Sequence, residues 1–335
     1  MVPVREALLG LLVLPAFAGT VTVDGAAVEL TFSDPEIIES SGLAVVGDWV
    51  VTTNDSGDTG RVFVVDGSGA TVGVSAWSAE PRDVEALAPG EADEVWVGDI
   101  GDNSGVRDSI EITPVTVGAR DIDVDAPSYE LVYPDGARDA ETLMRDPTTG
   151  RLYIATKEIF GGLLYEVPEQ LDPVKPNRLR ELGEVLPIAT DGAFFPDGRH
   201  LVVRGYNSAV VYAFPTLDEV GEVELPDQRQ GEGIAVTEDR DLLISTEGQF
   251  TDVQRVPLPA GIRAAMDPPP PATPSPSDSE PSTSEPSSSS PTTESREDSE
   301  LPETTETVRS PWPWFLGGFV GLGIILVLMR SLRRR

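Results

Sequence analysis

Residues 41–44 read Ser41-Gly42-Leu43-Ala44, and a segment of the same type returns four more times along the chain. Each copy begins with an acidic or polar residue, continues with a small residue and ends with an apolar pair. The other copies are Glu85-Ala86-Leu87-Ala88, Glu141-Thr142-Leu143-Met144, Asp191-Gly192-Ala193-Phe194 and Glu232-Gly233-Ile234-Ala235. Their first residues are 44, 56, 50 and 41 positions apart. Repeats of this length are typical of β-propeller blades, and a small residue suits the crowded innermost strand of a blade.

The rest of the region 19–266 also predicts strands. Short alternating apolar runs at 49–53, 94–98 and 151–155 follow the repeated openings, and turn signals such as Asp135-Gly136 separate them. We therefore expect an all-β domain, a β-propeller of about five blades. The segment 21–32 precedes the first opening and is expected to complete the sheet that begins at Glu232. Residues 106–135 leave room for a further blade, so a count of six stays open.

The two ends of the chain predict a surface-anchored protein. Residues 1–18 resemble a signal peptide, with an apolar run and the cleavage site Ala16-Phe17-Ala18. Residues 267–310 are rich in Pro, Ser, Thr and acidic residues, which predicts an extended, disordered stalk. Residues 311–329 are apolar and long enough for a transmembrane helix, and the Arg-rich tail 330–335 is expected on the cytoplasmic side. We thus expect a single-pass membrane protein with an extracellular N-terminal domain.

A second kind of anchoring stays open. The sequence Leu301-Pro302-Glu303-Thr304-Thr305 resembles the LPXTG signal that sortases recognise, with Thr305 at the position of the glycine. If a transpeptidase used this motif, the protein would be attached to the cell wall instead of the membrane. Both alternatives place the folded domain at the cell surface.

Composition and charge exclude several classes of site. The chain of 335 residues has no Cys, which excludes disulfides, thiolate metal sites and cysteine nucleophiles. Its single histidine, His200, argues against a zinc site or a Ser-His-Asp triad, and we expect it to be exposed beside a turn. The 24 Lys and Arg residues against 57 Asp and Glu residues give a net charge of −33, which argues against nucleic-acid binding. Chemistry in this protein must therefore use carboxylates, hydroxyls and amides.

Several motifs together resemble an uncharacterised family of secreted bacterial β-propellers. They are Ser41-Gly42-Leu43, Asn54-Asp55-Ser56-Gly57, Gly98-Asp99-Ile100-Gly101-Asp102-Asn103, Thr156-Lys157-Glu158, Asp191-Gly192-Ala193-Phe194-Phe195-Pro196-Asp197-Gly198 and Gly231-Glu232-Gly233-Ile234. The resemblance covers nearly all of residues 19–259 and implies a propeller fold outside the cell. More distantly, the blade openings are similar to those of β-propeller phytases and of proteins with an esterase-like activity of phytase.

Polar residues at the ends of the second strands predict a cation site. Equivalent strand ends in a propeller converge on one mouth of the central channel, and the comparable positions carry Lys157-Glu158 and Arg204 in two blades. Carboxylate and amide oxygens without thiols or imidazoles suit Ca²⁺, which takes hard oxygen ligands. The predicted calcium ligands are Asp55, Asp99, Asp102, Asn103 and Glu247.

An alternative explains the same residues without a metal ion. Asp55, Asp58, Asp99, Asp102 and Asn103 would then form Asx turns and loop caps. In the same alternative, the acidic residues of the two segments 82–85 and 138–141, which share an Arg-Asp-x-Glu pattern, would accept hydrogen bonds from Arg82 and Arg138.

Three function classes follow from these observations. The lack of a clear nucleophile–base pair favours a binding or scaffold module over an enzyme, with an extracellular protein, a glycan or a small molecule as its partner. The alternative is a calcium-dependent hydrolase of phosphoesters, lactones or other esters, in which carboxylates hold the metal and activate water. The negative charge would repel a highly phosphorylated substrate. A purely architectural role without a ligand is the third class.

Overall fold

The computed structural model describes residues 25–55 and 57–267, which form 22 β-strands and one short helix. The expected signal peptide (1–18), most of the stalk, the apolar segment 311–329, the tail 330–335 and the motif at 301–305 lie outside the described residues. The helix, α1 (Ala260–Met266), has 7 residues. In the part of the chain that the structure describes, no helix is long and apolar enough to span a bilayer.

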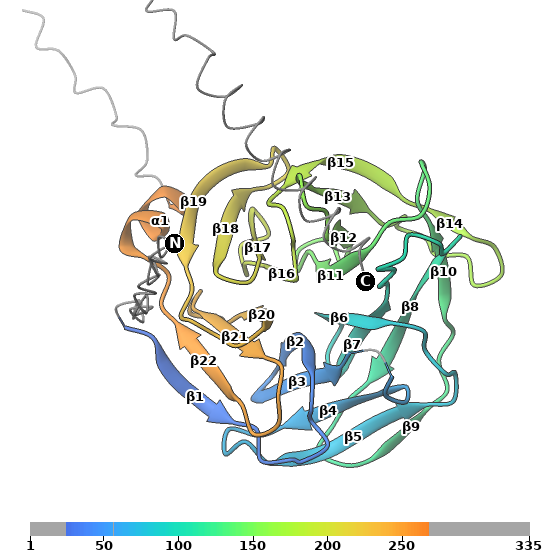
Figure 1. Cartoon of the computed structure of the whole chain (residues 1–335), viewed down its shortest axis with the longest axis horizontal. Helices are drawn as coiled ribbons and strands as arrows, with labels where there is room; N and C mark the ends of the chain where they lie inside the picture. Colours follow the sequence, from blue (N-terminus) through green and yellow to red (C-terminus); the bar gives the residue numbers. More distant parts are fainter. Residues whose placement is uncertain (1–24, 56, 268–335) are drawn as a thin grey trace, which may run out of the picture. The chain divides into compact units, whose positions relative to one another are not determined.

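The strands form five sheets arranged like blades around a central axis (Figure 1). We number the blades 1 to 5 in the order in which their innermost strands occur in the chain. These strands are β2 (Ser40–Val46), β6 (Val84–Pro89), β11 (Ala140–Arg145), β16 (Asp191–Phe194) and β20 (Gly231–Val236). Each of them contains one of the five repeated openings, so the predicted all-β propeller of five blades is confirmed.

Each blade continues outward from its inner strand by antiparallel pairing. The second strands are β3 (Trp49–Asn54), β7 (Glu94–Asp99), β12 (Leu152–Thr156), β17 (His200–Arg204) and β21 (Leu242–Thr246). The third strands are β4 (Arg61–Val65), β8 (Ile110–Thr116), β13 (Gly162–Glu166), β18 (Ser208–Ala213) and β22 (Asp252–Val256). The fourth strands are β5 (Thr71–Trp77), β10 (Tyr129–Val132), β15 (Arg180–Val185), β19 (Asp218–Glu224) and β1 (Ala27–Thr31).

The N-terminal strand β1 completes blade 5 and closes the ring. It pairs antiparallel with β22, with Ala27 opposite Arg255 and Thr31 opposite Asp252. Arg255 also forms an ion pair with Glu29 on β1, at 2.7 Å. The expected closing strand within residues 21–32 is therefore confirmed for its described part.

The alternative of a sixth blade is wrong. The strands within residues 106–135 are β8, β10 and the short strand β9 (Ile122–Val124). The strands β8 and β10 belong to blade 2, whereas β9 adds to the edge of blade 1 by parallel pairing with β5. The two-residue strand β14 (Asn177–Arg178) similarly adds to β10 at the edge of blade 2. The longest spacing, between the openings at Glu85 and Glu141, is explained by β9, because this segment leaves blade 2 to pair with β5. The added strand covers the outer edge of blade 1, which would otherwise be open.

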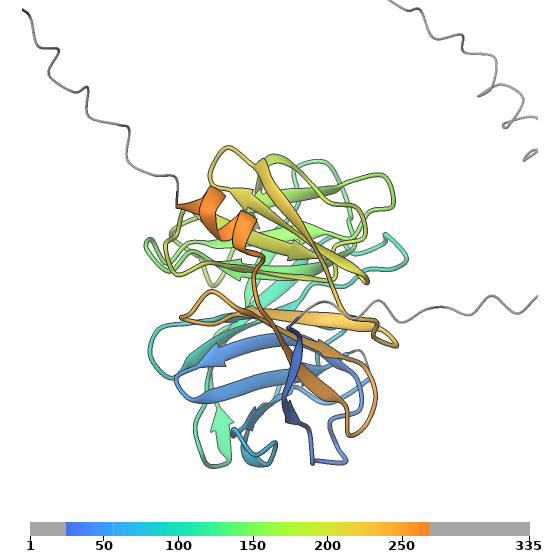
Figure 2. The same ribbon diagram turned by 90° about the vertical axis from the view of Figure 1, so that its left-hand side faces the viewer.

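The hydrophobic core is divided into five clusters, one between each pair of neighbouring blades. For example, Ile112 of blade 2 packs in one cluster with Leu143 and Ile154 of blade 3. The cluster between blades 4 and 5 also contains Ile262 and Met266 of α1, which lies at the rim of the ring beside β19 (Figures 1 and 2). Because apolar burial is provided between the blades, the residues at the mouth of the channel need not be apolar.

Four of the five inner strands carry an extra residue at the repeated opening. In the pairing of the first strand with the second, residues 41–42 and residues 232–233 each lie opposite a single residue. Glu85 and Glu141 have no residue opposite them. Such a β-bulge breaks the in–out alternation of side chains and changes the direction in which the extra residue points. The side chains of the polar first residues in these repeats therefore do not follow the in–out alternation of the apolar residues after them.

The small second residue of the repeat is required by close backbone contacts. A Cβ atom on Gly42 would lie 2.5 Å from the backbone N of Leu87 in the next blade. A Cβ atom on Gly233 would lie 2.5 Å from Ser245 Oγ. Both distances are too short for any side chain, which confirms the crowding expected of the innermost strands.

Candidate functional site

Equivalent residues of three blades meet at the end of the channel where the inner strands begin. Asp55, Lys157 and Glu247 directly follow the second strands β3, β12 and β21. The backbone N–H of each donates to the carbonyl of the residue that precedes the inner strand of its own blade, at 3.0 Å in all three. The shared hydrogen bond fixes the three residues at the same height in their blades, as the repeats predicted.

A group of three carboxylates lies between blades 1 and 2. One carboxylate oxygen from each of Asp55, Asp83 and Glu85 lies within 4.8 Å of the others. Asp83 precedes β6 and Glu85 is the bulged residue of that strand. A cavity of about 10 Å³ adjoins the group and is lined by Asp55, Asp58 and Asp83 among others. A space of this size is close to what a single water molecule or ion needs.

Glu85 is the most strongly perturbed carboxyl of the group. Its side chain is nearly excluded from solvent, with a relative exposure of 3%. Burial, and then the charges of Glu141 and Asp55, raise its pKa to about 10. Burial also raises the pKa of Asp83 to about 6, with a contribution from Asp55. Without a cation, Glu85 is therefore protonated at neutral pH.

The contacts of Ser41 agree with a protonated Glu85. The Ser41 hydroxyl donates to the Glu85 carbonyl oxygen at 2.8 Å, and Ser41 Oγ also lies 3.1 Å from Glu85 Oε2. A serine hydroxyl has one hydrogen to donate but can accept as well. Both contacts are fully satisfied when the protonated carboxyl of Glu85 donates to Ser41 Oγ.

Two more glutamates of the inner strands are buried beside the group. Glu141 and Glu232 are each 4% exposed, and in each residue Oε2 lacks a hydrogen-bond partner among the described residues. Lys157 forms an ion pair with Glu141 Oε1, and its Nζ lies 5.4 Å from the centroid of the Tyr206 ring. One ammonium group therefore faces two buried carboxyl groups.

The carboxyls at this end of the channel form one continuous electrostatic unit. Burial raises the pKa of Glu141 to about 8, and the charge of Glu232 adds to this effect while Lys157 opposes it. Burial, and then the charges of Glu232 and Asp55, raise the pKa of Glu247 to about 7. We call the set Asp55, Asp83, Glu85, Glu141, Glu232 and Glu247 the acidic mouth. Within this set, Lys157 pairs with Glu141, whereas Asp55, Asp83 and Glu85 gather between blades 1 and 2.

Blade 4 contributes structural polar groups instead of a mouth carboxylate. Arg204 is fully buried and donates to four backbone carbonyls and to Gln228 Oε1. Asp191, also fully buried, accepts hydrogen bonds from the backbone N–H groups of Gly192 and Ile234, both at 2.8 Å. Arg204 therefore fastens blade 4 to blade 5, and the charged ring expected from the sequence has a gap there.

Asp99 has a capping role in the structure. Its carboxylate accepts the backbone N–H groups of Arg82 at 2.8 Å and Asp83 at 3.0 Å, and it pairs with Arg107 at 2.8 Å. Asp99 ends β7 as Asn54 ends β3, and Asn54 Oδ1 likewise accepts two backbone N–H groups in the segment before its inner strand. Asp55 and Asp99 each lie 14 positions after the first residue of their blade opening, yet they differ by one place in the strand pairing.

The other predicted ligands divide between the mouth and its supporting loops. Asp102 is buried and accepts the backbone N–H groups of Val106 at 3.0 Å and Arg107 at 2.8 Å, whereas Asn103 is exposed. Of the predicted calcium ligands, the structure thus brings Asp55 and Glu247 to the acidic mouth and gives Asp99 and Asp102 capping contacts. Calcium binding itself stays a prediction.

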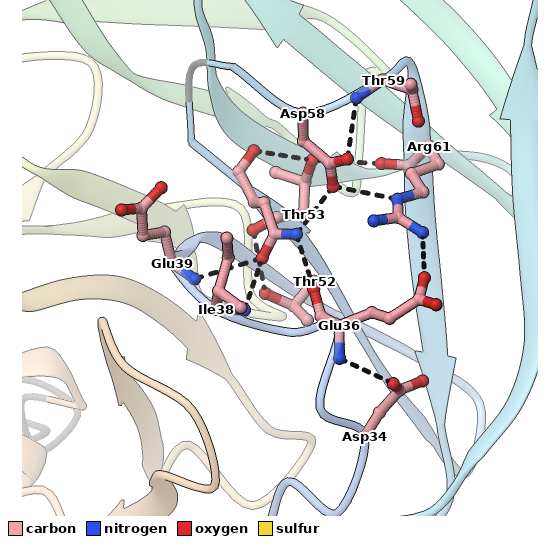
Figure 3. Close-up of polar contacts among 10 residues, drawn as sticks. Asp34, Glu36, Ile38, Glu39, Thr52, Thr53, Asp58, Thr59 and Arg61 are labelled. Carbon is pink, nitrogen blue, oxygen red and sulfur yellow. Dashed lines mark hydrogen bonds and ion pairs between the residues drawn. The ribbon is translucent and has the colours of Figure 1, made fainter.

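Asp58 also serves the loop behind the mouth (Figure 3). Figure 3 shows its carboxylate between the backbone N–H of Thr59, at 2.8 Å, and the guanidinium of Arg61, at 2.9 Å. Arg61 in turn pairs with Glu36. These contacts hold the loop that presents Asp55, and they agree with the loop-cap alternative for Asp58.

Sequence reasoning did not predict that Asp83 and Glu85 lie beside Asp55. The Arg-Asp-x-Glu pattern did mark these two acidic residues in the sequence. The interpretation without a metal ion, however, predicted that they accept hydrogen bonds from Arg82 and Arg138. Arg138 instead pairs with Asp135 and Glu158. The expectation for His200 was wrong, since it is only 7% exposed and its Nδ1 lies 2.8 Å from Asp197 Oδ2.

A comparison with protein-family models found no match to this chain, and a comparison with curated proteins found none either. The functional argument therefore depends on the fold and on the chemistry of the acidic mouth.

The residues of the mouth fit a calcium ion. Three carboxylates supply up to six oxygen atoms, and Ca²⁺ takes six to eight oxygen ligands. The backbone of Gly101 lies directly against two of these carboxylates, because a Cβ atom there would lie 2.4 Å from Asp83 Oδ2 and 2.8 Å from Glu85 Oε1. The unpartnered oxygens of Glu141 and Glu232 add negative potential next to the group. The donor set is thus hard and anionic, as calcium requires.

Proposed function

We propose that this protein is a binding module of the cell surface whose propeller holds a calcium ion at the acidic mouth. The observation that carries the proposal is the convergence of Asp55, Asp83 and Glu85 within 4.8 Å between two blades. Ionised carboxylates at this spacing would repel one another by about 3 kcal/mol per pair at 5–6 Å and an effective dielectric constant near 20. A divalent cation would offset this repulsion and allow Glu85 to ionise beside Asp55 and Asp83.

The residues have separate tasks in the proposed site. Asp55, Asp83 and Glu85 hold the ion, and the Ser41 hydroxyl orients Glu85 by its two contacts. The bound ion would supply positive charge and join the loop after β3 to the start of β6. Occupancy would therefore shape the face that the propeller presents to a partner, which we expect to be an extracellular protein, a glycan or a small molecule.

The surface location is part of the proposal and depends on the sequence. The signal-like segment 1–18, the stalk at 267–310 and the apolar segment 311–329 support display on a membrane anchor, and the motif at 301–305 supports the cell wall as the alternative. The resemblance to secreted bacterial propellers agrees with both. Labelling of intact cells with a reagent that does not cross membranes should modify lysines of the propeller, and an unlabelled propeller would contradict display.

A calcium-dependent hydrolase of phosphoesters or other esters is the second candidate. It is favoured by the pKa of Glu247, which burial raises to about 7, because a carboxylate with such a pKa is suited to general-base catalysis at neutral pH. Turnover of a chromogenic ester or phosphoester that is lost in Glu247→Gln, with calcium binding intact, would support the enzyme over the binding module.

Thermal unfolding of the purified full-length protein in detergent tests the calcium site. Calcium should raise the melting temperature relative to EGTA, because a ligand that binds only the folded state stabilises it by about 2.7 kcal/mol at a hundredfold excess over Kd. Asp83→Asn should remove most of this gain. Asp48→Asn, a change of the same type at an exposed turn, should keep it. Identical melting curves in calcium and EGTA would reject the site.

A further inference from the structure

A second cavity lies between blades 3 and 4, and one of its lining residues, Tyr206, is also next to Lys157 at the acidic mouth. It has a volume of about 590 Å³ and is walled by the end of β15, the loop 186–188, the turn 205–208 and the outer strands β18 and β19. Small-molecule sites typically enclose 300–1,000 Å³. The side chains that give this groove its character are Glu184, Ile188, Tyr206, Tyr212, Glu219 and Glu222.

The groove has charges of one sign only. Three glutamates line it, and no lysine, arginine or histidine is among its lining residues in the described part of the chain. The register of β18 and β19 places Tyr212 opposite Glu219 and Val210 opposite Glu222. Residues two apart on a strand share a face, so both glutamates flank the same strip of tyrosine and valine.

The electrostatic effect of the two glutamates reaches the aromatic floor. Burial, and then the charges of Glu219 and Glu222, raise the pKa of Tyr212 to about 12. Tyr212 is therefore a neutral phenol at all physiological pH values. A neutral aromatic ring close to carboxylates is the environment that binds organic cations, which are attracted by the ring face as well as by the negative charges.

The loop that forms one wall is held in a strained conformation. Ile188 has φ = 54°, which is in the left-handed region that β-branched residues rarely adopt. Its N–H donates to the Glu158 carbonyl at 2.9 Å, which helps to hold the loop in place. Strain of this type is concentrated at ligand sites, where the surrounding structure maintains it. The apolar side chains of Leu186 and Ile188 thus stay beside the glutamates.

We propose that the groove between blades 3 and 4 binds a small organic cation, an ammonium group attached to an apolar or aromatic body. The ammonium group would lie near Glu219 and Glu222, and the apolar body would lie against Tyr212, Val210 and Leu186. None of the three proposed calcium ligands lines the groove, so this inference does not depend on calcium binding.

Phenethylammonium is a suitable probe, and 2-phenylethanol and phenylacetate are its neutral and anionic counterparts. Calorimetry with the full-length protein at low ionic strength, in EGTA, should show binding of the cation at one site per chain. The alcohol should bind about tenfold more weakly or worse, and the anion should not bind. Equal binding of the cation and the alcohol would overturn the proposal, since the glutamates would then contribute nothing.

Matched variants locate the site. Glu219→Gln combined with Glu222→Gln should weaken binding of phenethylammonium by about tenfold or more, whereas Glu224→Gln should leave it unchanged. Glu224 is an exposed residue of the same strand that does not line the groove. Equal loss in both variants, or loss only in Asp83→Asn, would overturn the proposal. The second result would place the probe at the acidic mouth and leave the calcium proposal to its own test.

Discussion

Replacement of Glu85 by glutamine should change the pH dependence of stability in a way that only a buried, protonated carboxyl explains. Burial, and then the charges of Glu141 and Asp55, raise the pKa of Glu85 to about 10, whereas in the unfolded chain it is near its ordinary value of 4.5. Between these two values the folded state binds one more proton than the unfolded state. The free energy of unfolding of the metal-free protein must therefore fall as the pH rises through this window.

The size of the effect follows from the width of the window. Stability falls by up to 1.36 kcal/mol per pH unit, so Glu85 should cost the metal-free protein about 3 kcal/mol between pH 4.5 and pH 7. Glutamine has nearly the same shape as a protonated glutamate and does not titrate. Glu85→Gln should therefore be close to wild type in stability at pH 4.5 and more stable by about 3 kcal/mol at pH 7.

Urea unfolding in EGTA at a series of pH values measures this difference directly. Calcium should reverse the order, because the wild type gains binding energy that the variant lacks. Parallel pH profiles for the two proteins in EGTA would refute the reasoning, since they would mean that Glu85 is ionised in the folded state. A control with Glu224→Gln, at an exposed position, should run parallel to the wild type.

Three further changes test how the ring is held together. Leu30→Ala in β1, 5% exposed, should cost about 2–5 kcal/mol in urea unfolding, whereas Val28→Ala on the same strand, 57% exposed, should cost less than about 1 kcal/mol; equal effects would contradict closure by β1. Gly42→Ala should be destabilising by about 1–3 kcal/mol because of its close contact with the next blade, whereas Gly67→Ala, with no neighbour within 4 Å, should be nearly neutral in the same assay. Arg204→Lys should lower stability by about 3–5 kcal/mol, because an ammonium group cannot replace a guanidinium that reaches five acceptors, and an unchanged melting temperature would contradict this role.

The fold could be predicted from the sequence because its signal is repeated. Five openings with a small second residue are enough to count blades, and the physical need for that residue is visible in the 2.5 Å approach at Gly42. The spacing alone could not exclude a sixth blade. Residues 106–135 have the composition of strands, and only the pairing of β9 with β5 assigns them to existing blade edges.

The site could be predicted only in part, because the hairpin between the first and second strands differs in length from blade to blade. Leu43 and Leu87 are the third residues of their openings, but Leu43 pairs with Thr52, nine positions later, whereas Leu87 pairs with Val97, ten positions later. Asp55 and Asp99 are equally distant from their openings and yet fall one place apart in the pairing of their blades. Asp99 consequently caps a loop, and the carboxylates that join Asp55 are Asp83 and Glu85 of the next blade. Contacts between blades of this kind have no signature in the spacing within one repeat.

The position of the proposed calcium site follows from differences between the five openings. Blade 3 balances Glu141 with Lys157, which also faces Glu232 of blade 5. Blade 4 uses Asp191 to accept two backbone N–H groups. Blade 1 begins with Ser41, whose hydroxyl contacts Glu85 without adding or cancelling charge. The side between blades 1 and 2 therefore gathers three carboxylates, and the Arg107 guanidinium near them is paired with Asp99 at 2.8 Å. A cation from solution would be bound most strongly at this side. If the repeats were identical, the charge would be spread evenly around the ring. The divergence of the repeats concentrates it at one place.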